Sequence, residues 1–229
     1  MRYHPRVMSL PIRLHQAVRL ALVTGALCAL SAHPASAQVR ERLPLFVVDL
    51  QGTLPKFPTH GGFSGPRGLG ESQLPAWGPG VNVGGQVFFK RGTKLSFGVG
   101  ATYVFTRGTK SPEPAEGQTV AEGPVVTTKY SGLMPQVSIN FGHRLGWSYI
   151  SGGLGQSTLT INRDDAPEEV GAGTRTINYG GGARWFMKDH LAFSIDLRFF
   201  AVNPVDAGIG AYGHPRKTML IFSAGVSFQ

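Results

Sequence analysis

The residues that could take part in catalysis are few, and they fall in polar segments between runs of alternating residues. His60 and Ser64 lie in one such segment, and Asp206 and His214 lie in another. This set could supply a nucleophile, a general base and an orienting acid if folding brought them within hydrogen-bond reach. No spacing typical of a catalytic site links them. Ordinary loop polarity is the simpler interpretation, and we expect no enzymatic activity.

Four charged residues lie instead inside alternating runs, on the same face as small polar residues. They are Asp49, Arg184, Asp196 and Arg198. Buried charges are tolerated when they are paired and hydrogen-bonded. We therefore predict that these four side chains form an ion-pair and hydrogen-bond network inside the fold. The alternative is a charged gate for ions.

Three further patterns resemble binding sites only superficially. Glycines cluster at 152–155 and 180–182, but a phosphate-binding loop requires a following helix, and no helical pattern follows either cluster. The acidic run 164–169 lacks the glycine and spacing of a calcium loop. The only cysteine, Cys28, lies near the amino terminus. We expect no metal and no cofactor.

The amino-terminal segment has the order of a secretory signal peptide. Four arginines precede an apolar run at residues 20–30, and Ala35-Ser36-Ala37 follows as a small-x-small cleavage site. We predict cleavage after Ala37, so that residues 1–37 form the signal and residues 38–229 the mature domain. Removing four arginines from a formal charge of +9 leaves about +5. This modest surplus does not predict nucleic acid as a partner.

The rest of the chain alternates between apolar and small or polar residues, as strands with two different faces do. The clearest run is 95–105, in which Leu95, Phe97 and Val99 begin one face and Ser96 and Gly98 the other. No run is long and apolar enough for a membrane-spanning helix. Eight strands are predicted, at residues 45–54, 80–89, 95–105, 130–141, 147–159, 174–187, 191–200 and 217–229.

Two of these strands carry an irregularity. Pro135 removes one donor from the ladder, so we predict a bulge there. In the fifth strand the glycines at 152, 153 and 155 leave the assignment of faces open. The connections alternate strictly between long and short, beginning with a long one. In an up-and-down barrel this places all four long connections at one rim and all three short turns at the other.

The chain resembles the small eight-stranded bacterial outer-membrane β-barrels of the OmpA transmembrane domain and OmpX type. The resemblance rests on the strand number, the rhythm of the connections and a final strand that carries Phe228 near its end. It implies an all-β, antiparallel, up-and-down transmembrane barrel in the outer membrane of a Gram-negative-type bacterium. It also implies a monomer in a lipid bilayer, inserted by machinery that reads the closing strand. Gln229 follows Phe228, where Phe is the usual last residue.

The faces of the predicted strands can be assigned by size. Small polar residues fit the narrow interior of eight strands, whereas a ring of large apolar residues would overfill it. The aromatic residues near both strand ends then predict two belts at the membrane interfaces, with scatter by β-propensity as the alternative. The predicted belt residues are Phe89, Phe141, Trp147 and Trp185 near the short turns, and Tyr103, Phe105, Tyr130 and Phe199 near the long connections.

The resemblance leaves three functional hypotheses. In the first, a barrel with a plugged lumen has a structural or surface-interaction role, and its external loops contact lipopolysaccharide, host cells or neighbouring cells. The second is a narrow pore for small or apolar solutes. The third is a lipid acyltransferase or deacylase that would use Ser64, a histidine and an acid near the outer leaflet. Of these we favour the first.

Overall fold

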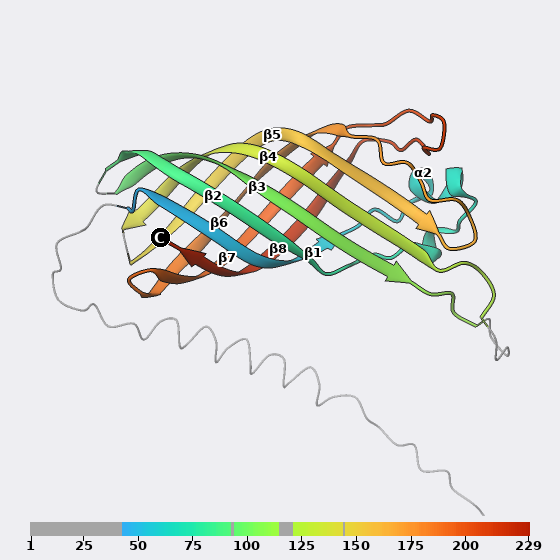
Figure 1. The fold of residues 1–229 in the computed structure, drawn as a ribbon, viewed down its shortest axis with the longest axis horizontal. Coiled ribbons are helices and arrows are strands. Elements are labelled where there is room, and N and C mark those ends of the chain that lie inside the picture. Colours follow the sequence, from blue (N-terminus) through green and yellow to red (C-terminus); the bar gives the residue numbers. More distant parts are fainter. Residues whose placement is uncertain (1–42, 93, 115–120, 144) are drawn as a thin grey trace, which may run out of the picture. The chain divides into compact units, whose positions relative to one another are not determined.

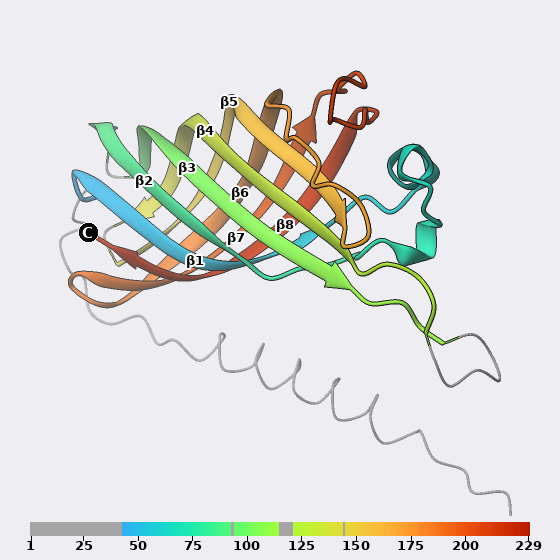
Figure 2. The ribbon, with the colours of Figure 1, turned by 45° about the vertical axis from the view of Figure 1, so that its right-hand side comes forward.

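The structure is a computed structural model that describes residues 43–92, 94–114, 121–143 and 145–229. The predicted signal peptide lies outside the described residues. The eight strands of the described chain form a closed antiparallel barrel in which each strand pairs with the next and the last pairs with the first. The long connections gather at one end of this barrel and the short turns at the other (Figures 1 and 2). The predicted eight-stranded barrel is confirmed.

The elements follow one another in a simple order, with the only helical turns in the described chain between the first two strands. None of these turns is long and apolar enough to cross a membrane. The elements are β1 (Phe46–Lys56), α2 (Gly61–Ser64), η1 (Gly65–Arg67), η2 (Glu71–Gln73), β2 (Gly80–Arg91), β3 (Leu95–Lys110), β4 (Val126–His143), β5 (Gly146–Arg163), β6 (Thr174–Lys188), β7 (Leu191–Val202) and β8 (Lys217–Phe228).

The barrel closes where β1 pairs with β8, from Val48 opposite Phe228 to Lys56 opposite Leu220. Closure leaves no sheet edge, which is the condition for strands to cross a bilayer. Strands β3, β4 and β5 run further than predicted at the end of the long connections, where Val126 pairs with both Lys110 and Arg163. Backbone pairing continues there beyond the apolar residues. The predicted strands are too short at this end because the polar residues were assigned to the connections.

The bulge predicted at Pro135 is wrong. Pro135 lies opposite Ala101 in an unbroken β3–β4 register, and the β4–β5 register is the same on both sides of it. The β4–β5 pairs omit only Met134 and Pro135, because proline has no N–H to donate to β5. The register shifts lie instead at Phe88/Lys90 in β2 and Phe186/Lys188 in β6, beside short turns.

The apolar face of the strands is the outer wall. Leucine, valine, isoleucine and phenylalanine side chains on all eight strands are exposed there, as lipid-facing positions of a barrel are. Six of the eight predicted belt residues are among the exposed side chains. These are Phe89, Tyr103, Phe105, Phe141, Trp185 and Phe199.

Two of the predicted belt residues point into the barrel, so their assignment to the belts is wrong. Tyr130 is 0% exposed and meets Phe200 edge to face at 5.9 Å between ring centroids. Trp147 is 3% exposed and stacks on Phe186 at 5.1 Å. Alternation along β4 gives Tyr130 the inward parity of Met134, which is also 0% exposed.

The interior is divided into layers. A large apolar cluster fills the half below the long connections and joins the strands to Phe57, Phe63, Leu69 and Leu74 of the first connection. A smaller aromatic cluster fills the end at the short turns, around Phe88, Trp147 and Tyr149. Polar and charged side chains also lie buried inside the barrel. The glycines of β5 allow the backbones of β4 and β5 to approach closely. A Cβ on Gly153 would lie 1.9 Å from the Pro135 carbonyl oxygen, so only glycine fits there.

Candidate functional site

The interior charges form two ion pairs. The Arg184 guanidinium donates to Asp49 through Nε at 2.9 Å and through Nη2 at 2.6 Å, and the Ser227 hydroxyl donates to the same carboxylate. The guanidinium also lies over the Tyr149 ring, with 4.1 Å between Cζ and the centroid. Both charged side chains are buried, so the paired geometry offsets the desolvation of each charge.

The second pair lies on one strand. Arg198 Nε is 2.8 Å from Asp196 Oδ1, and its Nη atoms donate to Gln136 at 2.8 Å and to Ser151 at 2.6 Å. The Tyr149 hydroxyl donates to Asp196 at 2.6 Å. Because Tyr149 contacts both Asp196 and Arg184, it links the two ion pairs. All four charged residues therefore lie in one connected group, as the sequence led us to expect, although the linking role of Tyr149 was not predicted.

Neutral polar side chains form a separate chain of hydrogen bonds across the lumen. Thr102 donates to Asn82, Asn82 donates to Gln51 at 2.9 Å, and Gln51 donates to Ser194 at 3.0 Å. These residues come from β3, β2, β1 and β7, so the chain of hydrogen bonds passes from wall to wall. Such a network can fill and rigidify a narrow barrel. The Ser227 hydroxyl donates to Asp49, but that carboxylate is already paired with Arg184 and is therefore a poor general base.

A third buried ion pair lies at the mouth beneath the long connections, and it was not predicted from the sequence. Arg67, which ends η1, donates to Glu169 through Nη2 at 2.6 Å and through Nε at 3.2 Å. Glu169 also accepts from the backbone N–H groups of Ile161 at 2.9 Å and Tyr212 at 3.2 Å. Arg67 faces the Tyr212 ring at 5.2 Å. We call Arg67, Glu169 and Tyr212 the mouth latch, because they join the first, third and last long connections.

The candidate catalytic residues take structural positions. Phe63 packs edge to face against His60 at 4.8 Å and stacks on His214 at 5.3 Å. His60 Nδ1 accepts from the Gly62 N–H as the N-cap of α2. Ser64 is buried, and no hydrogen bond joins its hydroxyl to a histidine within the described residues. Nor does Asp206 contact His214 through an ion pair in that part of the chain. The arrangement does not provide an activated nucleophile.

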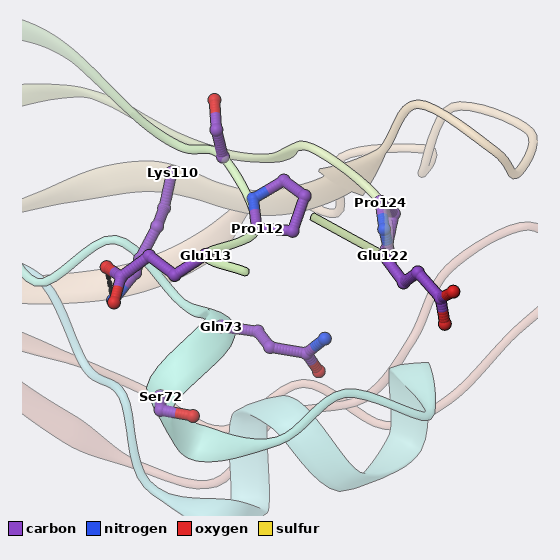
Figure 3. A pocket seen from close by; sticks show the side chains of 8 residues that line it. Ser72, Gln73, Lys110, Pro112, Glu113, Glu122 and Pro124 are labelled. Carbon is purple, nitrogen blue, oxygen red and sulfur yellow. Dashed lines mark ion pairs between the residues drawn. The ribbon is translucent and has the colours of Figure 1, made fainter. Parts of the chain in front are cut away.

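A pocket of about 170 Å³ lies between η2 and the β3–β4 connection (Figure 3). Ser72 and Gln73 of η2 line one side, and the carboxylate of Glu113 is already engaged by Lys110 at 3.6 Å. Its remaining lining residues are Ser111, Pro112, Glu122 and Pro124. Hydroxyl, amide and paired carboxylate groups suit loop contacts rather than catalysis.

The acidic run 164–169 is paired with basic side chains of the strand ends. Lys129 donates to Glu168 at 2.7 Å, and its ammonium holds the pKa of Glu168 below the ordinary value. Arg163 donates to both carboxylate oxygens of Asp165, which lowers the pKa of that group. Among the described residues, no group of three or more histidine, cysteine or acidic side chains could hold a metal ion.

Comparisons with known proteins agree with this architecture. No protein-family model matches the chain, and no curated protein matches it. Among solved structures, Neisserial surface protein A matches with a TM-score of 0.51 and 12% identity over 81% of this chain and 97% of that one. The attachment invasion locus protein Ail of Yersinia pestis matches with a TM-score of 0.44 and 12% identity over 80% and 95%.

A third match is the N-terminal β-barrel domain of Pseudomonas aeruginosa OprF, with a TM-score of 0.35 and 13% identity over 82% and 98%. The likeness to Neisserial surface protein A, together with strand order and closure, establishes the fold. The chain is a small eight-stranded barrel of the kind found in bacterial outer membranes.

Proposed function

We propose that this protein is a closed outer-membrane barrel with a surface-interaction role, in which the barrel anchors a preorganised set of external loops. The observation that carries the proposal is the mouth latch. One buried carboxylate, Glu169, is bound by Arg67 of the first long connection and by the Tyr212 N–H of the last. Loops fixed against one another in this way bind a partner with a smaller entropic cost than free loops would.

The latched loops carry apolar side chains on their outer surface. Ile209 is fully exposed, and Val170 and Tyr212 are exposed beside it on the third and last connections. The Val170 N–H donates to the Gly210 carbonyl at 2.7 Å, so the two connections are joined directly under this group. An exposed apolar surface on the connections, outside the strands, is suited to contact another molecule. We name Val170, Ile209 and Tyr212 the loop patch.

The proposal includes a plugged lumen. The apolar cluster beneath the first connection and the aromatic cluster at the short turns leave the Asp49–Arg184 and Asp196–Arg198 pairs enclosed between side chains. Filling of the barrel is the role we assign to these pairs. A narrow pore is the second hypothesis, and electrical conductance tests it. A lipid-acting enzyme finds no support in the positions of Ser64 and the histidines.

Its partners follow from where the barrel would sit. The exposed apolar wall would contact the lipid bilayer, and basic side chains at the rim, including Arg107 and Arg175, would face phosphate groups of lipopolysaccharide. Phe228 lies exposed at the end of β8, where the insertion machinery could read it. We propose a monomer, as in the resemblance, with no nucleic acid partner. The name of Neisserial surface protein A is consistent with a role at the surface.

The experiment uses the full chain folded into lipid vesicles, with folding checked by heat-modifiable migration on a denaturing gel. Vesicle binding to immobilised lipopolysaccharide and to epithelial cells is compared for the native chain and for Val170→Ser/Ile209→Ser. We expect the double substitution to reduce binding, while Lys110→Gln, which lies outside the loop patch, leaves it unchanged.

Planar-bilayer recording completes the test, and we expect no stable conductance steps from the native chain. Steps that disappear when Arg184 or Arg198 is replaced would support the gated pore instead. Binding that is equal for the native chain and the loop-patch variant would overturn the surface-interaction role.

A further inference from the structure

The outer wall of the barrel is not smooth. Gly152 faces outward on β5 in register with Val137 on β4 and Tyr179 on β6, so a row of large apolar side chains is interrupted at its middle. The resulting groove has two overlapping parts of about 710 Å³ and 520 Å³ that share these three residues. We call it the β5 groove. Its other outward lining residues are Val99, Pro135, Ile139, Ile150, Leu154 and Ile177.

The shape of the β5 groove follows from residue types. A Cβ on Gly152 would approach the Asn178 carbonyl oxygen only to 3.5 Å, so the site is open and a side chain would fit there. The side chains around Gly152 form ridges. Val137 on β4 is 64% exposed, and Leu154, two residues along β5, is 69% exposed. The floor is therefore the backbone itself, at a depth of about one side chain. In a bilayer only an apolar group can fill such a space.

A cation lies above this groove on the neighbouring strand β6. Arg175 is two residues beyond Ile177 and four beyond Tyr179 towards the long connections, which is about 14 Å along β6 at 3.4 Å per residue. Its side chain is exposed, and it has no ion-pair partner among the described carboxylates. By contrast, Lys129 on the same rim is already bound to Glu168.

We propose that the β5 groove and Arg175 together form a binding site for a phosphate-bearing membrane lipid. One acyl chain lies in the groove over Gly152, and the phosphate pairs with the Arg175 guanidinium. The proposal rests on the membrane location of the proposed function and adds a lipid site that is independent of the loop patch. The separation of about 14 Å matches a headgroup at the interface with its chain reaching into the apolar layer.

The alternative occupant, a second copy of the barrel, fits the groove less well. Two convex walls would meet on the ridges formed by Val137 and Leu154, and the floor at Gly152 would remain unfilled. Unfilled space forfeits dispersion contacts, so a slender chain is the better complement. The cation at Arg175 also gives an anionic lipid a contact that an apolar wall would not use.

The experiment measures lipid retention by native mass spectrometry of the full chain, folded in detergent and titrated with dimyristoyl phosphatidylglycerol or dimyristoyl phosphatidylcholine. We expect the native chain to retain one phosphatidylglycerol. Gly152→Leu fills the groove and should weaken both lipids about tenfold or more, since it excludes several methylene groups. Arg175→Gln should weaken phosphatidylglycerol about fivefold and phosphatidylcholine less, because the choline ammonium offsets the charge of its phosphate.

Two matched controls lie elsewhere on the barrel. Gly52→Leu adds the same side chain to the outer wall of β1, where a Cβ meets nothing closer than 3.9 Å, and Arg107→Gln removes a different exposed rim cation. Both should bind lipid as the native chain does. Equal retention by the Gly152→Leu variant would overturn the proposal, as would a dimer that only this substitution abolishes.

Failure of the lipid site and failure of the surface-interaction role are distinguishable. Heat-modifiable migration establishes that each variant is folded, and loop-patch binding is measured separately on vesicles. If the Gly152→Leu variant is folded and retains lipid normally, only the groove proposal fails. If the native chain does not fold into vesicles, the proposed membrane location fails as well.

Discussion

Arg184 on β6 donates two hydrogen bonds to Asp49 on β1, at 2.9 Å from Nε and 2.6 Å from Nη2. Strands β7 and β8 lie between β6 and β1 in the ring, so this pair joins walls that are not neighbours. It therefore ties the barrel across its lumen in addition to the backbone ladder.

Breaking this pair on one side should be more harmful than removing both charges. Arg184→Met leaves the buried Asp49 carboxylate unpaired, and we expect the free energy of unfolding to fall by about 3–5 kcal/mol. Asp49→Asn combined with Arg184→Met should recover part of the loss. Urea unfolding in lipid vesicles, followed by tryptophan fluorescence, measures both. Equal destabilisation by the single and double variants would contradict the buried-charge explanation.

Adjacent glycines of β5 should differ sharply in their tolerance of alanine. A Cβ on Gly153 would lie 1.9 Å from the Pro135 carbonyl oxygen, whereas one on Gly152 lies no closer than 3.5 Å to any neighbour. We expect Gly153→Ala to cost about 3 kcal/mol or to prevent folding, because the backbone must move. Gly152→Ala should stay within about 0.5 kcal/mol of the native chain. The urea midpoint and heat-modifiable migration distinguish these outcomes, and equal effects would contradict the close packing of β4 on β5.

The fluorescence of Trp147 and Trp185 should distinguish the inward from the outward face of the barrel wall. Trp147 is inside the barrel, whereas Trp185 is 49% exposed on the outer wall. In variants that keep one tryptophan, brominated lipids should quench Trp185 strongly and Trp147 weakly, since the quencher must reach the ring. Phenylalanine replaces the other tryptophans in each case. Strong quenching of Trp147 would contradict its position inside the barrel.

The mouth latch should control the order of the loops without controlling the fold of the barrel. Glu169→Gln removes the charge that Arg67 binds, and we expect the local opening free energy of the long connections to fall by about 3 kcal/mol. Trypsin should then cleave these connections faster in folded vesicles, with the strands still protected. Lys129→Gln breaks an exposed ion pair at the same rim, and it should change cleavage little, by about 0–1 kcal/mol. Equal acceleration by both variants would show that burial of the latch is unimportant.

Strand number, strand faces and closure could be predicted from the sequence because alternation is local. A residue such as Val99 needs only its neighbours to show which face it takes. Tyr130 shows how the alternation can be overlooked. It has the same parity as Met134, which indicates an inward side chain, but its position near a long connection led to the wrong prediction of a membrane-interface residue. Pro135 predicted a bulge that the uninterrupted pairing with Ala101 makes unnecessary.

The site was less predictable because its contacts are distant in the sequence. Arg67 and Glu169 are 102 positions apart, in connections whose composition indicated only polarity. The interior charges were recognisable from strand parity, but their partners depend on the order of strands around the ring and on the shear of the barrel. The β5 groove depends on both, because a single outward glycine becomes a groove only when β4 and β6 place large residues beside it.

Two carboxyl groups of the acidic run, Asp165 and Glu168, should titrate below their ordinary range. Arg163 donates to Asp165 at 2.8 Å from Nε and 2.6 Å from Nη2, and this lowers the pKa of Asp165 from its ordinary 3.8. A lowered folded-state pKa means that the ion pair is fully present above about 3.8 and is lost as the pH falls through the folded-state value. Carbon-13 NMR of labelled aspartate measures this titration directly. Arg163→Gln should return the pKa of Asp165 towards 3.8, whereas Lys129→Gln should raise only the pKa of Glu168. An unchanged Asp165 titration in the Arg163→Gln variant would show that the guanidinium is not the cause of the shift.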